Sequence, residues 1–396
     1  MEYGENRLAD YREDSTLSRG AMDVPFLLLT LLLLAIGVIM VLSSSFARAY
    51  YSASTNHNPS YFFTRQLLFA AVGIAVMILA SRFPIGFYRR LSPLIMLAAV
   101  VLLLFVLVAG KKVNGARRWF EMFGVTFQPS EIAKIAVILF DAEIVVRKKE
   151  KMGTFRHGVL PFALVAVIIV GLLVMEPHLS ASIIILAITA TMMFIGGTRL
   201  FWFLLGGGAV ALGGLLAVSV LDYSSERITA WLDPFADTSD TGYQILQSLY
   251  AIGSGGLSGL GLGNSRQKNL YLPEEHNDFI FSIVCEELGF IGAALILILF
   301  ALLIVRGYWL AMHCRDRYSF LVCTGITTLL ALQVILNVAV DTNLIPCTGI
   351  SLPFFSYGGT ALLIQLAEMG IVLSISREIP EKKLLSRRKS TAAAAK

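Results

Sequence analysis

Ten long apolar runs constrain the fold of this chain more than any other feature of its sequence. Each run is about as long as an α-helix must be, roughly 18 to 25 residues, to cross about 30 Å of hydrocarbon. Hydrophobic residues make up 56% of the 396 residues, which is typical of a polytopic membrane protein and not of a soluble one. The runs cover residues 24–46, 63–81, 91–109, 129–146, 158–175, 179–196, 200–221, 278–305, 319–340 and 353–375.

The positions of Lys and Arg predict how these helices are oriented. Ten crossings place both ends of the chain on one side of the membrane, and most of the 32 basic residues fall on that side, as expected if it is the cytoplasm. We therefore predict an all-α polytopic membrane protein with ten transmembrane helices over 24–376 and both termini, 1–23 and 377–396, in the cytoplasm. A large extracytoplasmic loop, 222–277, then joins helices seven and eight.

Charge and cysteine content exclude several other classes of protein. The net charge of +5 follows from the topology and gives no reason to invoke nucleic acid. The basic tail is either disordered or a weak contact with membrane lipids. The four cysteines and five histidines are scattered without the spacing of zinc ligands, so we predict no metal site from them.

One predicted outer loop carries more cations than the positive-inside rule expects. It joins the third and fourth helices and contains Lys111, Lys112, Arg117 and Arg118. These cations either anchor the loop to anionic outer headgroups or recognise a phosphate group, to which arginine can donate two parallel hydrogen bonds. The sequence alone leaves both interpretations open.

The fourth helix begins with ionisable residues inside an apolar run. Glu131 and Lys134 are three residues apart and therefore share one face of the helix. Charged groups within a membrane boundary are costly and usually face a cavity or each other. A structural ion pair and a pair that lines a catalytic cavity both fit this spacing.

The large outer loop contains two candidate elements. Residues 244–250 have the pattern of an amphipathic helix lying on the membrane surface. Six glycines follow within 253–263, where the backbone would form either a tight re-entrant turn or a contact with a pyrophosphate. The segment lacks the ending of a nucleotide-binding P-loop, so nucleotide binding is not expected.

Two predicted helices carry polar residues at i, i+4 and i+8, so each presents one polar face. These residues are Asp278, Ser282 and Glu286 on the eighth helix and Gln333, Asn337 and Asp341 on the ninth. The eighth-helix face must line something other than lipid. Asp278 either caps that helix or has a function at the outer rim. For the ninth helix we favour hydrogen bonds between helices.

Several motifs in a fixed order resemble a known family. They are NGARRWF, FQPSEIAK, GYQILQSLYAIGSGGLSGLGLGNSRQKNLYLPEEHNDFIFSIVCEELGFIG and IPCTGISLPFFSYGG. Together they are similar to the shape, elongation, division and sporulation (SEDS) family, and more similar to its FtsW and SpoVE members than to RodA. One departure is His178 after Glu176-Pro177, where many members have an acidic residue, so we assign no catalytic role to that position.

The resemblance implies a peptidoglycan glycosyltransferase in the bacterial cell membrane with an extracytoplasmic active site. Such an enzyme polymerises lipid II into glycan strands with inversion and releases undecaprenyl diphosphate, for cell division or sporulation. The implied partners are lipid II, the nascent glycan strand, a class B penicillin-binding protein that cross-links the product, and divisome proteins.

This reaction requires a base for the sugar hydroxyl and cations for the departing diphosphate. We expect the catalytic residues to be Asp278 as the base, with Glu131 holding Lys134 in place. The expected substrate-binding residues are Arg117, Arg118, Arg266, Lys268, Glu274 and His276. A divalent cation, Mg²⁺ or Mn²⁺, on Asp278 and the diphosphate is compatible with this scheme, but no ligand cluster in the sequence demands one.

Two other functions remain open at the level of sequence. A lipid II flippase would use charges deep in the membrane, and Asp141, Glu143 and Glu286 lie deeper than the rest, although the internal repeat typical of transporters is not evident. A noncatalytic scaffold that recruits division proteins would tolerate the loss of Asp278.

Overall fold

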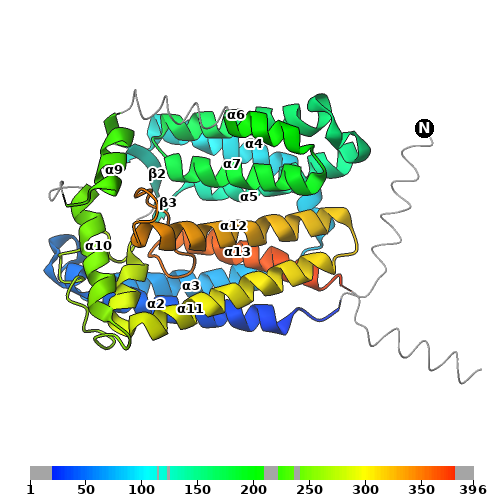
Figure 1. Ribbon diagram of the computed structural model, residues 1–396. Helices are drawn as coiled ribbons and strands as arrows, with labels where there is room; N and C mark the ends of the chain where they lie inside the picture. The colour runs from blue at the N-terminus through cyan, green and yellow to red at the C-terminus, as the bar shows by residue number, and fades with distance from the viewer. Residues whose placement is uncertain (1–19, 114–115, 123–124, 209–221, 236–240, 380–396) are drawn as a thin grey trace, which may run out of the picture.

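The protein is a bundle of long helices with short helices and a small sheet gathered at one end (Figure 1). The computed structural model describes residues 20–113, 116–122, 125–208, 222–235 and 241–379. The two ends of the described chain meet at the other end of the bundle, where the Gly20 backbone N–H donates to the Arg377 carbonyl at 2.9 Å. The rest of the predicted leader and tail, 1–19 and 380–396, lies outside the described residues.

Eight helices in the described residues are long and apolar enough to cross a membrane. They are α2 (Val24–Tyr51), α3 (Tyr61–Ala80), α4 (Ile85–Ala109), the span Phe155–Met175 made of η3 (Phe155–Val159) and α6 (Leu160–Met175), α7 (Leu179–Gly196), α11 (Ile280–Met312), α12 (Arg317–Asp341) and α13 (Gly359–Ser376). Short 3₁₀ turns, η1 (Ala53–Thr55) and η2 (Lys149–Gly153), follow α2 and α5. These eight spans coincide with eight of the ten predicted runs, so the membrane class is confirmed.

The fourth and seventh predicted runs are not among these eight membrane-spanning helices. The fourth forms α5 (Pro129–Lys148), which packs against α4, α7 and α12. Its four carboxylate and ammonium side chains up to residue 143 are buried inside the bundle and not exposed to lipid, which is why α5 lacks the apolar character of the other spans. Residues 200–208 of the seventh run are helical, and 209–221 lie outside the described residues. The sidedness of the bundle in the membrane stays a prediction.

The all-α prediction missed a small antiparallel sheet in the loop between α4 and α5. Its strands are β1 (Lys111–Val113), β2 (Ala116–Met122) and β3 (Val125–Phe127), in the order β1-β2-β3. Such short, charged strands give little periodic signal in a sequence. The Phe120 ring stacks on Phe105 of α4 with centroids 5.0 Å apart, which fixes the sheet on the end of that helix.

The large loop between the seventh and eighth predicted helices is folded. It contains α9 (Asp222–Leu232) and α10 (Thr241–Gly255). The predicted helix over 244–250 is therefore correct, and its location on the membrane surface stays a prediction. Residues 245–248 are buried, and α10 packs along α11 because its Ser248 hydroxyl meets the Ser282 hydroxyl at 2.6 Å.

The glycine-rich segment closes a break in α11. Gly289 interrupts the helix with φ 67° and ψ −173°, a backbone conformation that favours glycine. The backbone N–H groups of Leu260 and Gly261 donate to the carbonyls of Glu286 and Glu287, each at 3.0 Å, so they satisfy groups that the break leaves unpaired. The segment is thus a tight turn, and the N–H groups of Gly259 and Gly261 donate to protein carbonyls.

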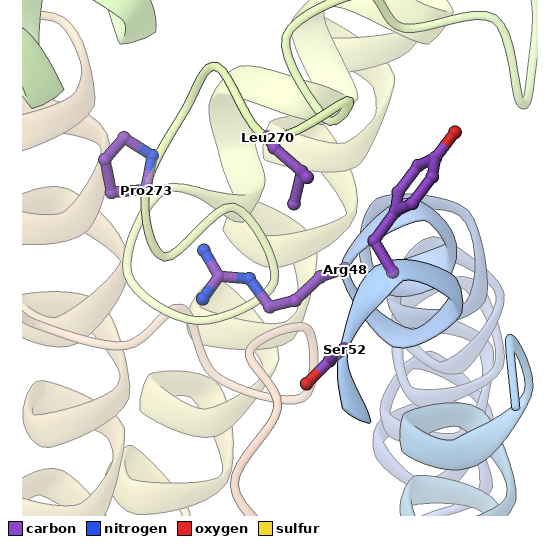
Figure 2. Close-up of a pocket in the computed structure, with 5 residues that line it drawn as sticks. Arg48, Ser52, Leu270 and Pro273 are labelled. Atoms are coloured by element: carbon purple, nitrogen blue, oxygen red, sulfur yellow. The ribbon is translucent and has the colours of Figure 1, made fainter. Parts of the chain in front are cut away.

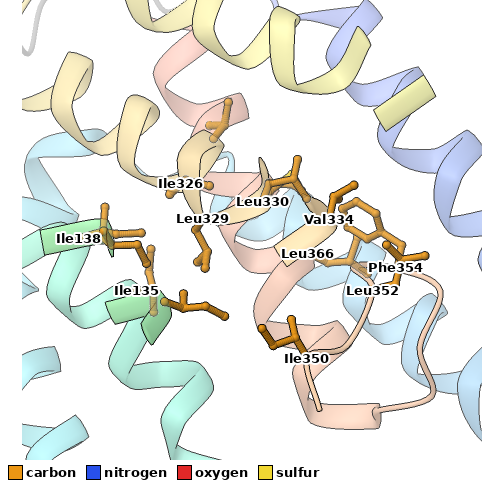
Figure 3. Close-up of a cluster of buried hydrophobic side chains, with 14 of the residues drawn as sticks. Ile135, Ile138, Ile326, Leu329, Leu330, Val334, Ile350, Leu352, Phe354 and Leu366 are labelled. Carbon is orange, nitrogen blue, oxygen red and sulfur yellow. The ribbon is translucent and has the colours of Figure 1, made fainter. Parts of the chain in front are cut away.

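A second loop, residues 344–358 between α12 and α13, has its middle part, 350–356, packed into the bundle. Figure 3 shows Ile350, Leu352 and Phe354 of this loop beside apolar side chains from α5, α12 and α13. All three are at most 5% exposed. Burial of this apolar segment fixes the position of the loop against the start of α11.

The break in α11 yields a stability prediction. A Cβ atom on Gly289 would lie 2.3 Å from the Gly259 backbone nitrogen, in addition to the strain of its positive φ. We expect Gly289→Ala to lower the free energy of unfolding by about 2 kcal/mol or more, measured by thermal denaturation of the detergent-solubilised protein. Gly253→Ala is the matched control, because a Cβ there meets nothing within 4 Å. Equal melting temperatures for both variants would contradict this account.

Candidate active site

Asp278 lies in the turn immediately before α11 and is partly exposed. The helix begins after Phe279 without a side-chain cap, so Asp278 does not serve as its N-cap. Asn337 of α12 donates to the Asp278 backbone carbonyl at 2.8 Å. On the other side the carboxylate adjoins the loop 344–358, where a Cβ on Gly349 would lie 3.1 Å from Asp278 Oδ2.

Burial makes Asp278 a stronger base than an ordinary aspartate. Burial and the negative charge of Glu274 raise the pKa of Asp278 to about 6. Interactions with Arg227, Arg118 and His276 act in the opposite direction. A carboxylate with this pKa is ionised at neutral pH and still holds a proton better than an exposed one.

Arg118 and Arg227 approach this region from different elements. Arg118 on β2 donates through Nε to the Glu176 carbonyl at 3.3 Å and through Nη2 to the Pro177 carbonyl. Arg227 on α9 donates to the Cys347 carbonyl of the loop 344–358. Both guanidinium groups are therefore fixed by backbone carbonyls while their charges act on Asp278.

The other cations of the sheet lie elsewhere. Arg117 is exposed and donates to the Leu107 carbonyl at the end of α4, at 3.2 Å. Lys111 forms an exposed ion pair with Glu121 on the neighbouring strand. The side chain of Lys112 lies outside the described residues. Only Arg118, among the described cations of this sheet, is placed to act on Asp278.

Glu131 and Lys134 form the ion pair that their spacing predicts. Lys134 Nζ lies 2.8 Å from Glu131 on the first turns of α5, and both side chains are less than 10% exposed. The charge of Lys134 also reaches His178 at the start of α7, together with that of Arg118. The pair is thus buried beside the turn 176–178, whose carbonyls accept hydrogen bonds from Arg118.

The structure does not bring Lys268 and Arg266 to Asp278. Lys268 Nζ lies 2.8 Å from Glu287 and 3.2 Å from the Ser43 hydroxyl, so its charge is neutralised inside the protein. Arg266 has an exposed side chain, and its backbone N–H donates to Glu286 at 3.0 Å. The two residues fasten the glycine-rich segment to the break in α11, and the expected diphosphate contact of Lys268 stays a prediction.

The segment before Asp278 is fixed by an ion pair with α2. Arg48 binds Glu275 through two nitrogen–oxygen contacts of 2.8 Å. Burial acts to raise the pKa of Glu275, but His276, whose Nδ1 lies 3.7 Å from the carboxylate, and the hydrogen bonds from Arg48 outweigh it and lower that pKa. His276 is buried with its ring 4.6 Å from that of Phe62, whereas Glu274 is partly exposed and accepts a hydrogen bond from Asn277.

A cavity of about 280 Å³ opens beside this ion pair. Figure 2 shows Arg48 at the end of α2 extending toward the loop that carries Leu270 and Pro273, and Ser52 and Tyr51 complete the lining. Asp278 does not line this cavity, so we do not assign it to the reaction. The ion pair between Arg48 and Glu275 at its edge instead fixes the segment that precedes Asp278.

The two polar faces predicted from the sequence are largely used within the protein. Asp341 Oδ2 accepts from both the backbone N–H and the hydroxyl of Ser282, each at 3.1 Å. Glu286 accepts from the Ser265 hydroxyl and from backbone N–H groups of the glycine-rich segment. Hydrogen bonding between α12 and its neighbours is confirmed for Asn337 and Asp341. In the described part of the chain no three His, Cys, Asp or Glu side chains are grouped to hold a metal ion.

The sequence alone does not single out two residues of this region. Arg227 lies in the predicted large loop 222–277 and is a cation like those of the sheet. Glu176 precedes His178, the position to which we assign no catalytic role, and both lie in the turn whose carbonyls accept from Arg118.

The fold and these motifs define a class of polytopic membrane protein, and comparison with known proteins identifies its family. The model of the cell cycle protein family that comprises FtsW, RodA and SpoVE matches residues 24–381. The chain belongs to this family, which is the SEDS family that its motifs resemble.

Individual relatives agree with the family assignment. The chain is 40% identical to a probable peptidoglycan glycosyltransferase FtsW of Trichlorobacter lovleyi, over 89% of this chain and 93% of the relative. It is 41% identical to the stage V sporulation protein E of Bacillus subtilis, over 91% and 99%. These values fit the predicted similarity to FtsW and SpoVE.

Solved structures share the fold. A chain of a peptidoglycan synthase complex, described for the coordination of polymerization and crosslinking, superposes with a TM-score of 0.75 at 27% identity over 91% of this chain and 99% of that one. The rod shape determining protein RodA of Thermus thermophilus gives a TM-score of 0.67 at 27% identity over the same shares.

The assignment of Lys268 to structure is testable. Removing one partner of a buried ion pair leaves an uncompensated charge, so we expect Lys268→Met to lower the free energy of unfolding by about 3 kcal/mol. The double variant Lys268→Met/Glu287→Gln should recover most of this loss. Thermal denaturation in detergent measures both, and Lys111→Met, which breaks an exposed pair, is the matched control. A Lys268→Met protein of normal stability that fails to use its substrate would restore Lys268 to the substrate site.

Proposed function

We propose that this protein is a peptidoglycan glycosyltransferase that polymerises lipid II into glycan strands, with release of undecaprenyl diphosphate. Its family membership and the names of its relatives support this activity. The single structural observation that carries the proposal is a partly buried carboxylate, Asp278, whose pKa is raised to about 6 and on which the charges of Arg118 and Arg227 act. A base and fixed cations are what an inverting transfer from a diphosphate requires.

In the proposed reaction Asp278 accepts the proton of the sugar 4-hydroxyl on one substrate. The hydroxyl oxygen forms a bond to the anomeric carbon of the other substrate from the face opposite the diphosphate. The bond from that carbon to the diphosphate oxygen breaks, and the diphosphate leaves with the electron pair. Arg118 and Arg227 stabilise the charge that develops on it, so a separate acid is not obligatory.

Glu131 and Lys134 take a supporting part in this proposal. Their buried pair keeps an ammonium group near the turn bound by Arg118 without adding net charge. We retain the pair as catalytic positioning residues and Arg118, Glu274 and His276 as substrate-site residues. A divalent cation shared between Asp278 and the diphosphate is compatible with the arrangement.

The site faces the extracytoplasmic side in this proposal, and the protein works with a class B penicillin-binding protein and divisome proteins. A solved relative belongs to a peptidoglycan synthase complex for polymerization and crosslinking, which supports a cross-linking partner. The exterior location is supported by the cytoplasmic assignment of most basic residues.

Lipid II transport is the alternative activity. Two of the three deeper carboxylates that left it open have structural partners, because Glu143 pairs with Arg89 and Arg147, and Glu286 binds the glycine-rich segment. The third, Asp141, is buried in α5. Fluorescent lipid II in proteoliposomes separates the two activities, because a transporter moves the label across the bilayer without joining sugars.

Removal of the base tests the proposal. We expect Asp278→Asn to reduce polymerisation of purified lipid II by at least about 100-fold, because the amide cannot accept the proton. Gel analysis of the glycan product measures the effect, and a melting temperature near that of the wild type shows that the variant is folded. Asp233→Asn, an exposed carboxylate at the end of α9, is the control. A fully active Asp278→Asn protein would remove Asp278 from the mechanism.

The pKa of Asp278 predicts an acid limb in the pH profile. The base must be ionised to accept a proton, and its pKa is raised to about 6. Polymerisation should therefore be constant above that value and fall about tenfold per pH unit below it. Initial rates at saturating lipid II between about pH 5 and pH 8 measure this limb. A rate that does not change over this range would show that Asp278 is not the group that accepts the proton.

A further inference from the structure

The turn between α6 and α7 contains buried polar atoms that lack a protein partner. The Glu176 side chain is 1% exposed, and neither carboxyl oxygen has a hydrogen-bond partner among the described residues. His178 in the same turn is 7% exposed, and its Nδ1 also lacks a partner there. Other buried polar atoms of the described residues also lack a partner, but here a whole carboxyl group and an imidazole nitrogen do so within three residues, and a ligand would satisfy them.

The same turn is joined to the surroundings of Asp278 by two independent contacts. Arg118, whose charge acts on Asp278, donates to the carbonyls of Glu176 and Pro177. On the other side Ser180 donates to the Thr348 carbonyl, and the next residue, Gly349, adjoins the Asp278 carboxylate. Arg118 and the loop 344–358 therefore both lie between the turn that contains Glu176 and the Asp278 carboxylate.

The protonation states of this turn suit an anionic ligand. Burial, opposed only in part by Arg118, raises the pKa of Glu176 to about 8. Burial and the charges of Arg118 and Lys134 lower the pKa of His178 to about 3. At neutral pH the turn thus presents an uncharged acid and an uncharged imidazole beside a cation, so the acid can donate a hydrogen bond without repelling an anion.

We propose that Glu176 is a substrate-binding residue whose carboxylic acid donates a hydrogen bond to a diphosphate oxygen of the lipid-linked substrate, next to Arg118. The proton remains on Glu176 throughout, so no bond is made or broken there. This inference rests on the proposed function for the identity of the ligand. It adds to the site an uncharged donor that can bind the diphosphate without cancelling the positive charge of Arg118.

Two substitutions at one position separate this role from a structural one. Glu176→Gln keeps a donor in the form of an amide N–H, whereas Glu176→Ala removes it. We expect the alanine variant to raise the KM for lipid II about tenfold or more and the glutamine variant to stay close to the wild type. Glu150→Gln, an exposed carboxylate after α5, is the matched control. An alanine variant with an unchanged KM would overturn the proposal.

The pH profile gives a readout that a structural role would not change. The wild-type enzyme should lose affinity for lipid II as the pH rises through about 8, because ionised Glu176 cannot donate. Glu176→Gln should lack this alkaline limb, and an unaltered limb in that variant would overturn the proposal. The charged and titratable groups from the elements around the turn, which both proteins share, are Arg118, Glu131, Lys134, His178, Asp278 and Cys347.

A binding measurement distinguishes failure of this inference from failure of the proposed function. Farnesyl diphosphate is the probe, and its binding to the purified full-length protein is followed by thermal stabilisation without any turnover. We expect Glu176→Ala to weaken this binding about tenfold and Glu176→Gln to preserve it. Polymerisation by the wild type with equal probe binding in all three proteins would overturn the role of Glu176 alone. Absence of polymerisation by the wild type would overturn the proposed function, and the probe would still decide the role of Glu176.

Discussion

The break in α11 at Gly289 and the glycine-rich segment that fills it hold together the end of the bundle that carries Asp278. A broken helix within a membrane exposes backbone groups that lipid cannot satisfy. Here the N–H groups of Leu260 and Gly261 bind the carbonyls at the break, and Glu286 and Glu287 bind the same segment through their carboxylates. The charged chain from the glycines to Asp278 is thereby fixed against the bundle, and the position of Asp278 follows.

The cations of this end of the bundle fall into two groups, those that pair with carboxylates and those that bind backbone carbonyls. Lys268 and Arg48 have carboxylate partners and secure the chain that leads to Asp278. Arg118 donates to backbone carbonyls, which fix its position but leave its positive charge uncancelled. This difference separates groups that hold the structure from groups that are placed to act on a ligand, and the residue type alone does not reveal it.

The candidate site was predictable from the sequence where it depends on local spacing. Glu131 and Lys134 pair because residues three apart share a helix face, and Asp278 was singled out because a carboxylate precedes an apolar run. The role of Lys268 was not predictable, since its partners Ser43 and Glu287 are distant in the sequence. A role for Glu176 was not predictable either, because nothing in its local sequence shows that Arg118 and the loop 344–358 converge on its turn.

The sequence by itself determined the membrane class, most of the membrane spans and the family, because apolar length and motif order are local properties of the chain. Tertiary structure decided that α5 is enclosed, that α10 is buried along α11 and that the loop 344–358 enters the core. It also decided which cations meet Asp278. Those outcomes depend on how closely separate helices approach one another, and this distance is set by packing across the whole bundle.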